Sequence, residues 1–138
     1  MKNSADGPRA VVAAHGDLAA GLVSAVEQIT GLGAACLALS NKGLDAASLE
    51  AAVREAVRAH GATIVFTDLP GGSCAIAARK ATRDLPGVTV VMGVNLSTLL
   101  DFVLKGGADR AAAERSAARG RDALTVAPAS ASAPETRA

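Results

Sequence analysis

Four short, nearly continuous apolar runs, separated by segments with helical periodicity, constrain the fold of this chain more than any other feature. The runs lie at residues 10–14, 34–39, 63–66 and 88–92. Runs of this kind are typical of strands buried on both faces of a sheet. Their alternation with helical segments predicts an α/β fold: a doubly wound, mainly parallel sheet of four strands with helices on both faces.

Two further helices are predicted after the last apolar run. Leucine and valine recur at helical spacing over residues 96–104, with Asn95 placed to cap the helix and two glycines placed to end it. Residues 109–121 are rich in Ala and Arg and have no bulky apolar stripe. We therefore expect that segment to be a shallowly buried helix at an edge of the domain.

The two ends of the chain differ in composition from its middle. Residues 1–9 are polar, and residues 127–138 form a Pro/Ala/Ser segment that we expect to be disordered. Residues 124–126 (LTV) could form one short edge strand. The expected organisation is thus a single domain over residues 10–126 between two polar ends.

Composition excludes several classes of function. The 14 basic residues nearly cancel the 13 acidic ones, and the chain has no Trp or Tyr, so neither a field for polyanions nor a surface for base stacking is expected. Nucleic acid is therefore not an expected partner. The two cysteines, Cys36 and Cys74, lack the spacing of a disulfide scaffold or a zinc motif. With no secretion signal and no apolar run near the ~20 residues of a membrane span, a cytoplasmic location is expected, without metal or cofactor.

Two polar signals fall at the carboxyl ends of predicted strands, where open parallel sheets bind ligands. His15 ends the first apolar run, and Asp68 follows the third. If these two strands are neighbours, the two side chains face each other. A carboxylate that accepts one ring N–H of an imidazole leaves the other nitrogen free as a nucleophile, so we expect His15 and Asp68 to be catalytic.

A phosphate-binding turn is predicted beside this pair. Gly71 and Gly72 permit backbone conformations closed to other residues, and Ser73 adds a hydroxyl at the start of the next helix. The free N–H groups of a helix N-terminus favour an anion, which makes a phosphoryl group a fitting ligand. Alone, each residue has a plainer interpretation. His15 could be a strand-end histidine that hydrogen-bonds to the backbone, Asp68 and the two glycines could only form a turn, and Ser73 could only be a helix N-cap.

Other polar or reactive side chains are interpreted structurally. Asp17 is expected to cap the first helix, and Asn95 caps a later helix although it could touch the site. His60 suits the C-terminal end of a helix dipole, and Cys74 suits a small buried thiol.

Three blocks occur in order along the chain: HGDLAAGLVSAVEQITG at 15–31, TDLPGGS at 67–73 and GVNLSTLL at 93–100. Together they resemble the mannose-type IIA component of the bacterial sugar phosphotransferase system. The resemblance implies a phosphohistidine at Nε2 of His15, with Asp68 holding Nδ1. It implies phosphate transfer from the phosphocarrier protein HPr to a IIB component that phosphorylates sugar during uptake, with the membrane reached only through permease components. It also implies a homodimer in which a C-terminal strand, here residues 124–126, pairs antiparallel with the partner's sheet.

Three alternatives stay open at this stage. A regulatory module would use phospho-His15 as a signal without sugar transport. A carrier domain of the kind that feeds dihydroxyacetone kinases would share the same chemistry. A nucleotide-binding Rossmann-like or flavodoxin-like domain rests on fold alone, since the GxGxxG turn is missing after the first predicted strand.

Overall fold

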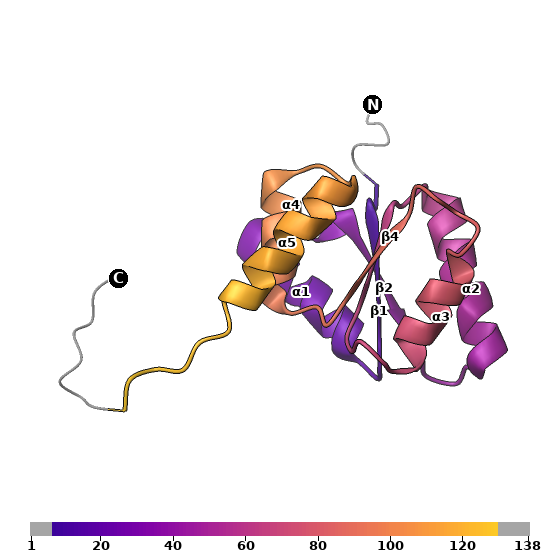
Figure 1. Ribbon diagram of the computed structural model, residues 1–138, viewed down its shortest axis with the longest axis horizontal. Coiled ribbons are helices and arrows are strands. Elements are labelled where there is room, and N and C mark those ends of the chain that lie inside the picture. The colour runs from indigo at the N-terminus through magenta and orange to yellow at the C-terminus, as the bar shows by residue number, and fades with distance from the viewer. Residues whose placement is uncertain (1–6, 130–138) are drawn as a thin grey trace.

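A computed structural model, described here for residues 7–129, shows a parallel four-stranded sheet between two layers of helices (Figure 1). The strands are β1 (Ala10–Ala14), β2 (Cys36–Ser40), β3 (Ile64–Thr67) and β4 (Thr89–Met92), in the order β2-β1-β3-β4. Every neighbouring pair is parallel. The predicted α/β class and four-stranded parallel sheet are confirmed, with strand boundaries shifted by no more than two residues.

The helices lie on both faces of the sheet, as predicted. In Figure 1 helices α1 (Leu18–Thr30), α4 (Leu96–Lys105) and α5 (Arg110–Asp122) lie on one side, and α2 (Ala46–His60) and α3 (Ser73–Ala81) lie on the other. A short 3₁₀ turn, η2 (Gly33–Ala35), precedes β2 and takes the first two residues of the predicted second strand. Because β1 and β3 continue into helices on opposite faces, their carboxyl ends border the crevice where such sheets bind ligands.

Each face of the sheet has its own apolar core. Val12, Ile64 and Phe66 pack with residues of α1, α4 and α5 on one side, while Val11 and Val65 pack with residues of α2 and α3 on the other. All five of these strand side chains are fully buried. Burial on both faces explains why these strands are continuously apolar in the sequence.

Helix α5 is more deeply buried than its sequence indicated. Ala113 is 1 % exposed and Ser116 is 0 % exposed, so the expectation of shallow burial was wrong for this stripe. Small side chains let α5 approach α4 closely, and at Gly120 an added Cβ would overlap the hydroxyl of Thr98. Burial here is achieved by close backbone approach and not by bulky side chains.

The C-terminal segment departs from the sequence-based prediction. Residues 124–129 form neither helix nor strand in the single chain, and the side chains of Leu124 and Val126 are 84 % and 95 % exposed. The predicted strand at residues 124–126 is therefore absent in the single chain, because the segment leaves the domain after α5 without pairing with the free edge of β4 (Figure 1). Most of the tail expected to be disordered, and residues 1–6, lie outside the described residues.

No helix within residues 7–129 has the length and hydropathy needed to cross a membrane.

Candidate functional site

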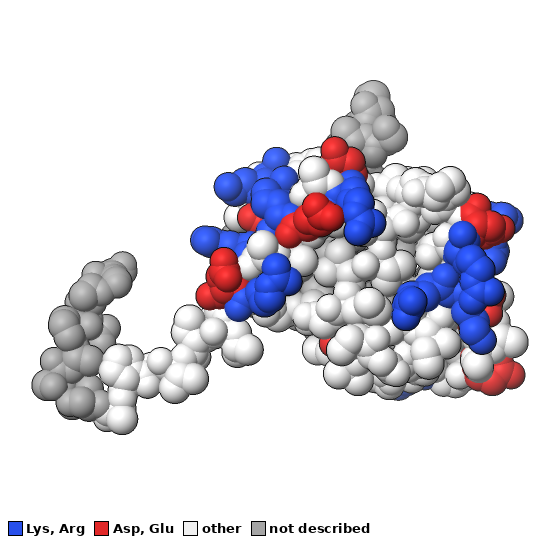
Figure 2. Space-filling model, viewed as in Figure 1, with Lys and Arg blue, Asp and Glu red and all other residues white. Residues whose placement is uncertain are grey.

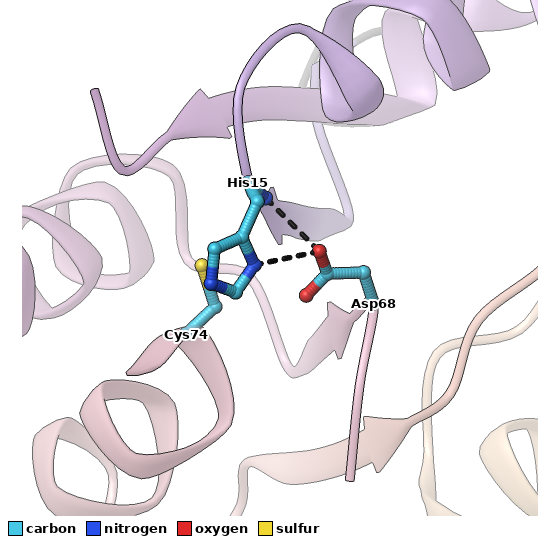
Figure 3. A group of neighbouring side chains, drawn as sticks. All are labelled: His15, Asp68 and Cys74. Carbon is cyan, nitrogen blue, oxygen red and sulfur yellow. Dashed lines mark hydrogen bonds and ion pairs between the residues drawn. The ribbon is translucent and has the colours of Figure 1, made fainter. Parts of the chain in front are cut away.

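The pairing of β1 with β3 brings His15 and Asp68 together, as the sequence predicted. Ala13 is in register with Thr67, and each strand then ends at the same edge of the sheet. Nδ1 of His15 lies 2.8 Å from Oδ2 of Asp68, and the backbone N–H of His15 donates to the same oxygen at 3.0 Å (Figure 3). One carboxylate oxygen therefore fixes both the backbone and the ring of His15.

Burial and hydrogen bonding act in opposite directions on Asp68. The side chain is only 9 % exposed, and that burial alone would raise its pKa. The hydrogen bonds from the backbone N–H and the ring of His15 outweigh burial and hold the pKa of Asp68 below its ordinary value. The carboxylate is thus anionic at neutral pH and favours a proton on Nδ1, so in the neutral ring Nε2 is the nitrogen with the free lone pair.

The free nitrogen of His15 faces the start of α3. Nε2 lies 3.2 Å from Oγ of Ser73, and the His15 side chain is 43 % exposed. Ser73 is the first residue of α3, whereas the N-cap is Gly72, so the N-cap interpretation of Ser73 was wrong by one position. The first N–H groups of a helix have no intrahelical acceptors, and here they belong to the helix that begins beside the ring.

The two glycines of the turn have different structural roles. A Cβ at Gly72 would lie 3.1 Å from Cε1 of His15 and 3.3 Å from Cδ1 of Leu69, so glycine permits the close approach of turn and ring. At Gly71 a Cβ would meet no atom within 4 Å. Neither glycine has a positive φ, so neither uses the conformational freedom that the sequence analysis expected glycine to provide at this turn.

Two residues at the end of β2 also shape the site, and sequence analysis missed them. The backbone N–H of Gly16 donates to Oδ1 of Asn41 at 3.1 Å, and Oγ of Ser40 donates to the Gly16 carbonyl at 2.7 Å. Gly16 has φ +59°, a conformation that favours glycine. The sequence did contain a signal for these contacts, because Ser40 and Asn41 form a polar pair directly after a predicted strand.

The remaining polar candidates have structural contacts. Asn95 caps α4 by accepting from the N–H of Thr98, and its amide donates to the carbonyl of Gly120. Asp17 stands at the N-cap position of α1 but makes no side-chain cap, because its carboxylate pairs with Lys42 at 2.8 Å. His60 is the last residue of α2 and is exposed. Cys74 is fully buried, as expected, in the first turn of α3 beside the site.

A family profile described as "EIIA-man: PTS system fructose IIA component" matches residues 9–118, most of the chain. The chain belongs to this family of phosphotransferase-system IIA components.

Solved structures agree with the fold of this IIA chain. The mannose/sorbose specific IIA subunit from Enterococcus faecalis has a TM-score of 0.76 at 20 % identity, covering 88 % of this chain and 96 % of that one. A phosphotransferase system EIIA component from Streptococcus agalactiae also has a TM-score of 0.76 at 20 % identity, with coverage of 86 % and 95 %. The IIA protein associated with the fucose utilization operon of Streptococcus pneumoniae has a TM-score of 0.68 at 22 % identity, with coverage of 87 % and 93 %. A comparison with curated proteins finds no match.

Family membership makes this IIA chain a component of the sugar phosphotransferase system. The site described above has the features that phosphotransfer needs: an oriented imidazole, a buried carboxylate behind it and a helix N-terminus in front of it.

Proposed function

We propose that His15 carries a phosphoryl group at Nε2, which it receives from phospho-HPr and passes to a IIB component. The observation that supports this most directly is the bond between Nδ1 of His15 and Asp68, because it leaves Nε2 unprotonated and exposed. Gly71, Gly72 and Ser73 would surround the transferred group, with the hydroxyl of Ser73 and the N–H groups of α3 as donors.

In the neutral ring with its proton on Nδ1, the transfer needs no base because Nε2 already has a free lone pair. The lone pair of Nε2 attacks phosphorus, the bond between phosphorus and the donor histidine breaks, and the donor nitrogen keeps the electron pair of that bond. Phospho-His15 then has a positively charged ring with its proton still on Nδ1. The anionic Asp68 stabilises that charge across the 2.8 Å contact, and the reverse sequence delivers the group to IIB.

The test is reconstitution with phosphoenolpyruvate, the first enzyme of the system and HPr. We expect an acid-labile, base-stable phosphoryl label on the wild type, none on His15→Ala, and full labelling of His60→Ala, which removes the other histidine of the chain. Absence of label on the wild type would refute the proposal. A labelled protein that no IIB component discharges would favour the regulatory alternative.

We further propose a homodimer in which residues 124–126 of one copy pair antiparallel with β4 of the other. Two observations support this. The outer edge of β4 has no neighbouring strand among the described residues, and free edges of this kind are normally covered. Leu124 and Val126 are among the most exposed apolar side chains of the described chain.

The surface around β4 is also suited to contact with another chain. Figure 2 shows Lys, Arg, Asp and Glu gathered over α5 on one side and over α2 and α3 on the other, with an uncharged area between them where β4 lies. An uncharged strand edge between charged helices fits pairing with an apolar strand. The relay would run in the cytoplasm, where the free thiols of Cys36 and Cys74 stay reduced.

A further inference from the structure

A third side chain at the site offers a chemistry that phosphotransfer does not use. One ring nitrogen of His15, one carboxylate oxygen of Asp68 and Sγ of Cys74 all lie within 4.8 Å of one another. Figure 3 shows the sulfur beside the imidazole, on the side away from Asp68. The three side chains come from the ends of β1 and β3 and from the first turn of α3. Within residues 7–129 no other three His, Cys, Asp or Glu side chains gather in this way.

The carboxylate of Asp68 has an unused ligand atom. Oδ2 receives both hydrogen bonds from His15, whereas Oδ1 is buried and has no hydrogen-bond partner among the described residues. The whole side chain is only 9 % exposed. A buried anionic oxygen without a partner is unfavourable, so this position favours a cation. The His15 side chain beside it is partly exposed, which gives such a cation a path from solvent.

We propose that His15, Asp68 and Cys74 bind a divalent cation of the zinc class. A set of one imidazole nitrogen, one carboxylate oxygen and one thiolate suits Zn²⁺ and Co²⁺, whereas Mg²⁺ and Ca²⁺ prefer oxygen ligands alone. Three protein ligands leave a fourth position for water. Binding releases the thiol proton of Cys74 to solvent, because the thiolate is the ligand.

Metal and phosphoryl group exclude each other at His15, a consequence that rests on the proposed function. A metal bound at Nε2 occupies the lone pair that would attack phosphorus. A metal bound at Nδ1 displaces the proton from that nitrogen, and the neutral ring then carries its proton on Nε2. In both cases Nε2 loses its nucleophilic lone pair, so zinc would switch the carrier off.

Sequence spacing predicted no metal site because it detects only ligands that are close along the chain. His15 and Asp68 are separated by 53 positions, and only the pairing of β1 with β3 brings them together.

The first experiment is a titration of the metal-free protein with Co²⁺, followed by absorption spectroscopy. We expect one cobalt ion per chain, d–d bands of four-coordinate cobalt, and a near-ultraviolet thiolate-to-cobalt charge-transfer band that Zn²⁺ abolishes. Cys74→Ser should lose the charge-transfer band. Asp68→Asn should weaken cobalt binding at least about ten-fold, because loss of even an outer-shell partner of a metal usually costs that much affinity.

Matched controls come from the same chain. Cys36→Ser removes the other cysteine and His60→Asn removes the other histidine, and both should keep the wild-type spectrum. Circular dichroism checks that each variant is folded, and Asp68→Asn tests the site without changing a cysteine. No thiolate band in the wild type, or a band that persists in Cys74→Ser, would overturn the proposal.

The second experiment measures phosphoryl transfer from phospho-HPr with and without Zn²⁺. Zinc should suppress labelling of the wild type, whereas Cys74→Ser should keep at least half of the labelling rate that it has without zinc. That result would also show that zinc does not inhibit the donor proteins. Equal inhibition of both would contradict the exclusion. If the metal-free wild type is not labelled at all, the proposed function fails, whereas the cobalt spectrum still decides the metal site.

Discussion

At the scale of single residues, the site depends on one carboxylate oxygen that accepts two hydrogen bonds. Oδ2 of Asp68 holds both the backbone N–H and Nδ1 of His15. The ring is therefore oriented by the end of β3 and not only by its own strand. Orientation of an imidazole by a buried carboxylate is also what sets the tautomer in catalytic triads.

Asp68→Asn should slow phosphoryl acceptance by on the order of 10²–10⁴-fold, because an amide lacks the charge that stabilises the imidazolium and permits the wrong tautomer. Rapid-quench measurement of labelling from phospho-HPr tests this. Asp17→Asn is the matched control, since the Asp17 side chain is 89 % exposed and, within residues 7–129, pairs only with Lys42. Equal rates for Asp68→Asn and the wild type would show that Asp68 has no part in transfer.

At the scale of elements, the packing of α5 on α4 combines close backbone approach with a charged cluster. The side chain of Asp101 is 7 % exposed, and its carboxylate accepts hydrogen bonds from Arg115 at 2.9 Å and from Ser116 at 3.0 Å. Burial alone would raise the pKa of Asp101, but these hydrogen bonds, with the charges of Arg115 and Lys105, hold it below its ordinary value.

A lowered pKa makes the contribution of Asp101 to stability pH-dependent. The stabilisation is present above the unfolded-state pKa of about 4 and is lost as pH falls through the lower folded-state value. Asp101→Asn should therefore reduce the free energy of unfolding by about 1–2 kcal/mol at pH 7 and by less near pH 3. This figure is kept low because Arg115 is partly exposed and solvent weakens its ion pair with Asp101. Urea unfolding at both pH values measures this; a deficit that grows on acidification would contradict it.

Gly120→Ala should destabilise the protein by about 1–3 kcal/mol, because its new methyl group overlaps Thr98 across the α4 and α5 contact. Gly21→Ala is the matched control in an exposed position of α1, where a Cβ meets no atom within 4 Å. The free energy of unfolding of that variant should rise by about 0.5–1 kcal/mol, because alanine has a higher helix propensity than glycine. Thermal unfolding of both variants tests the prediction, which fails if their melting temperatures move in the same direction.

At the scale of the whole molecule, the unpaired edge of β4 and the exposed segment after α5 bear on assembly. The proposed homodimer predicts that the full chain is dimeric and that a chain truncated after Ala123, which lacks residues 124–126, is monomeric. Sedimentation equilibrium of both chains measures this. Leu124→Ser with Val126→Ser should weaken the dimer without shortening the chain, and a truncated chain that stays dimeric would place the interface elsewhere.

Sequence analysis predicted the features that depend on local pattern, and it expected His15 to meet Asp68 on the condition that their two strands are neighbours. Four buried strands follow from continuous apolar runs, and the meeting of His15 with Asp68 follows from the pairing of β1 with β3. It missed the contacts of Ser40 and Asn41 with Gly16, which depend on how two loops approach each other. It also misjudged Gly72, whose role is the space it leaves for the His15 ring, a property of tertiary distance.

The shared oxygen of Asp68 makes the His15 amide a spectroscopic reporter. The backbone proton and the ring proton are held by the same carboxylate, so any change in ring charge redistributes electron density over both hydrogen bonds. Under the proposed phosphotransfer, the His15 amide resonance in a proton–nitrogen correlation spectrum should therefore shift each time the ring gains or loses a phosphoryl group. Phosphorylation of His15 could then be followed in real time, without a radioactive label and without stopping the reaction.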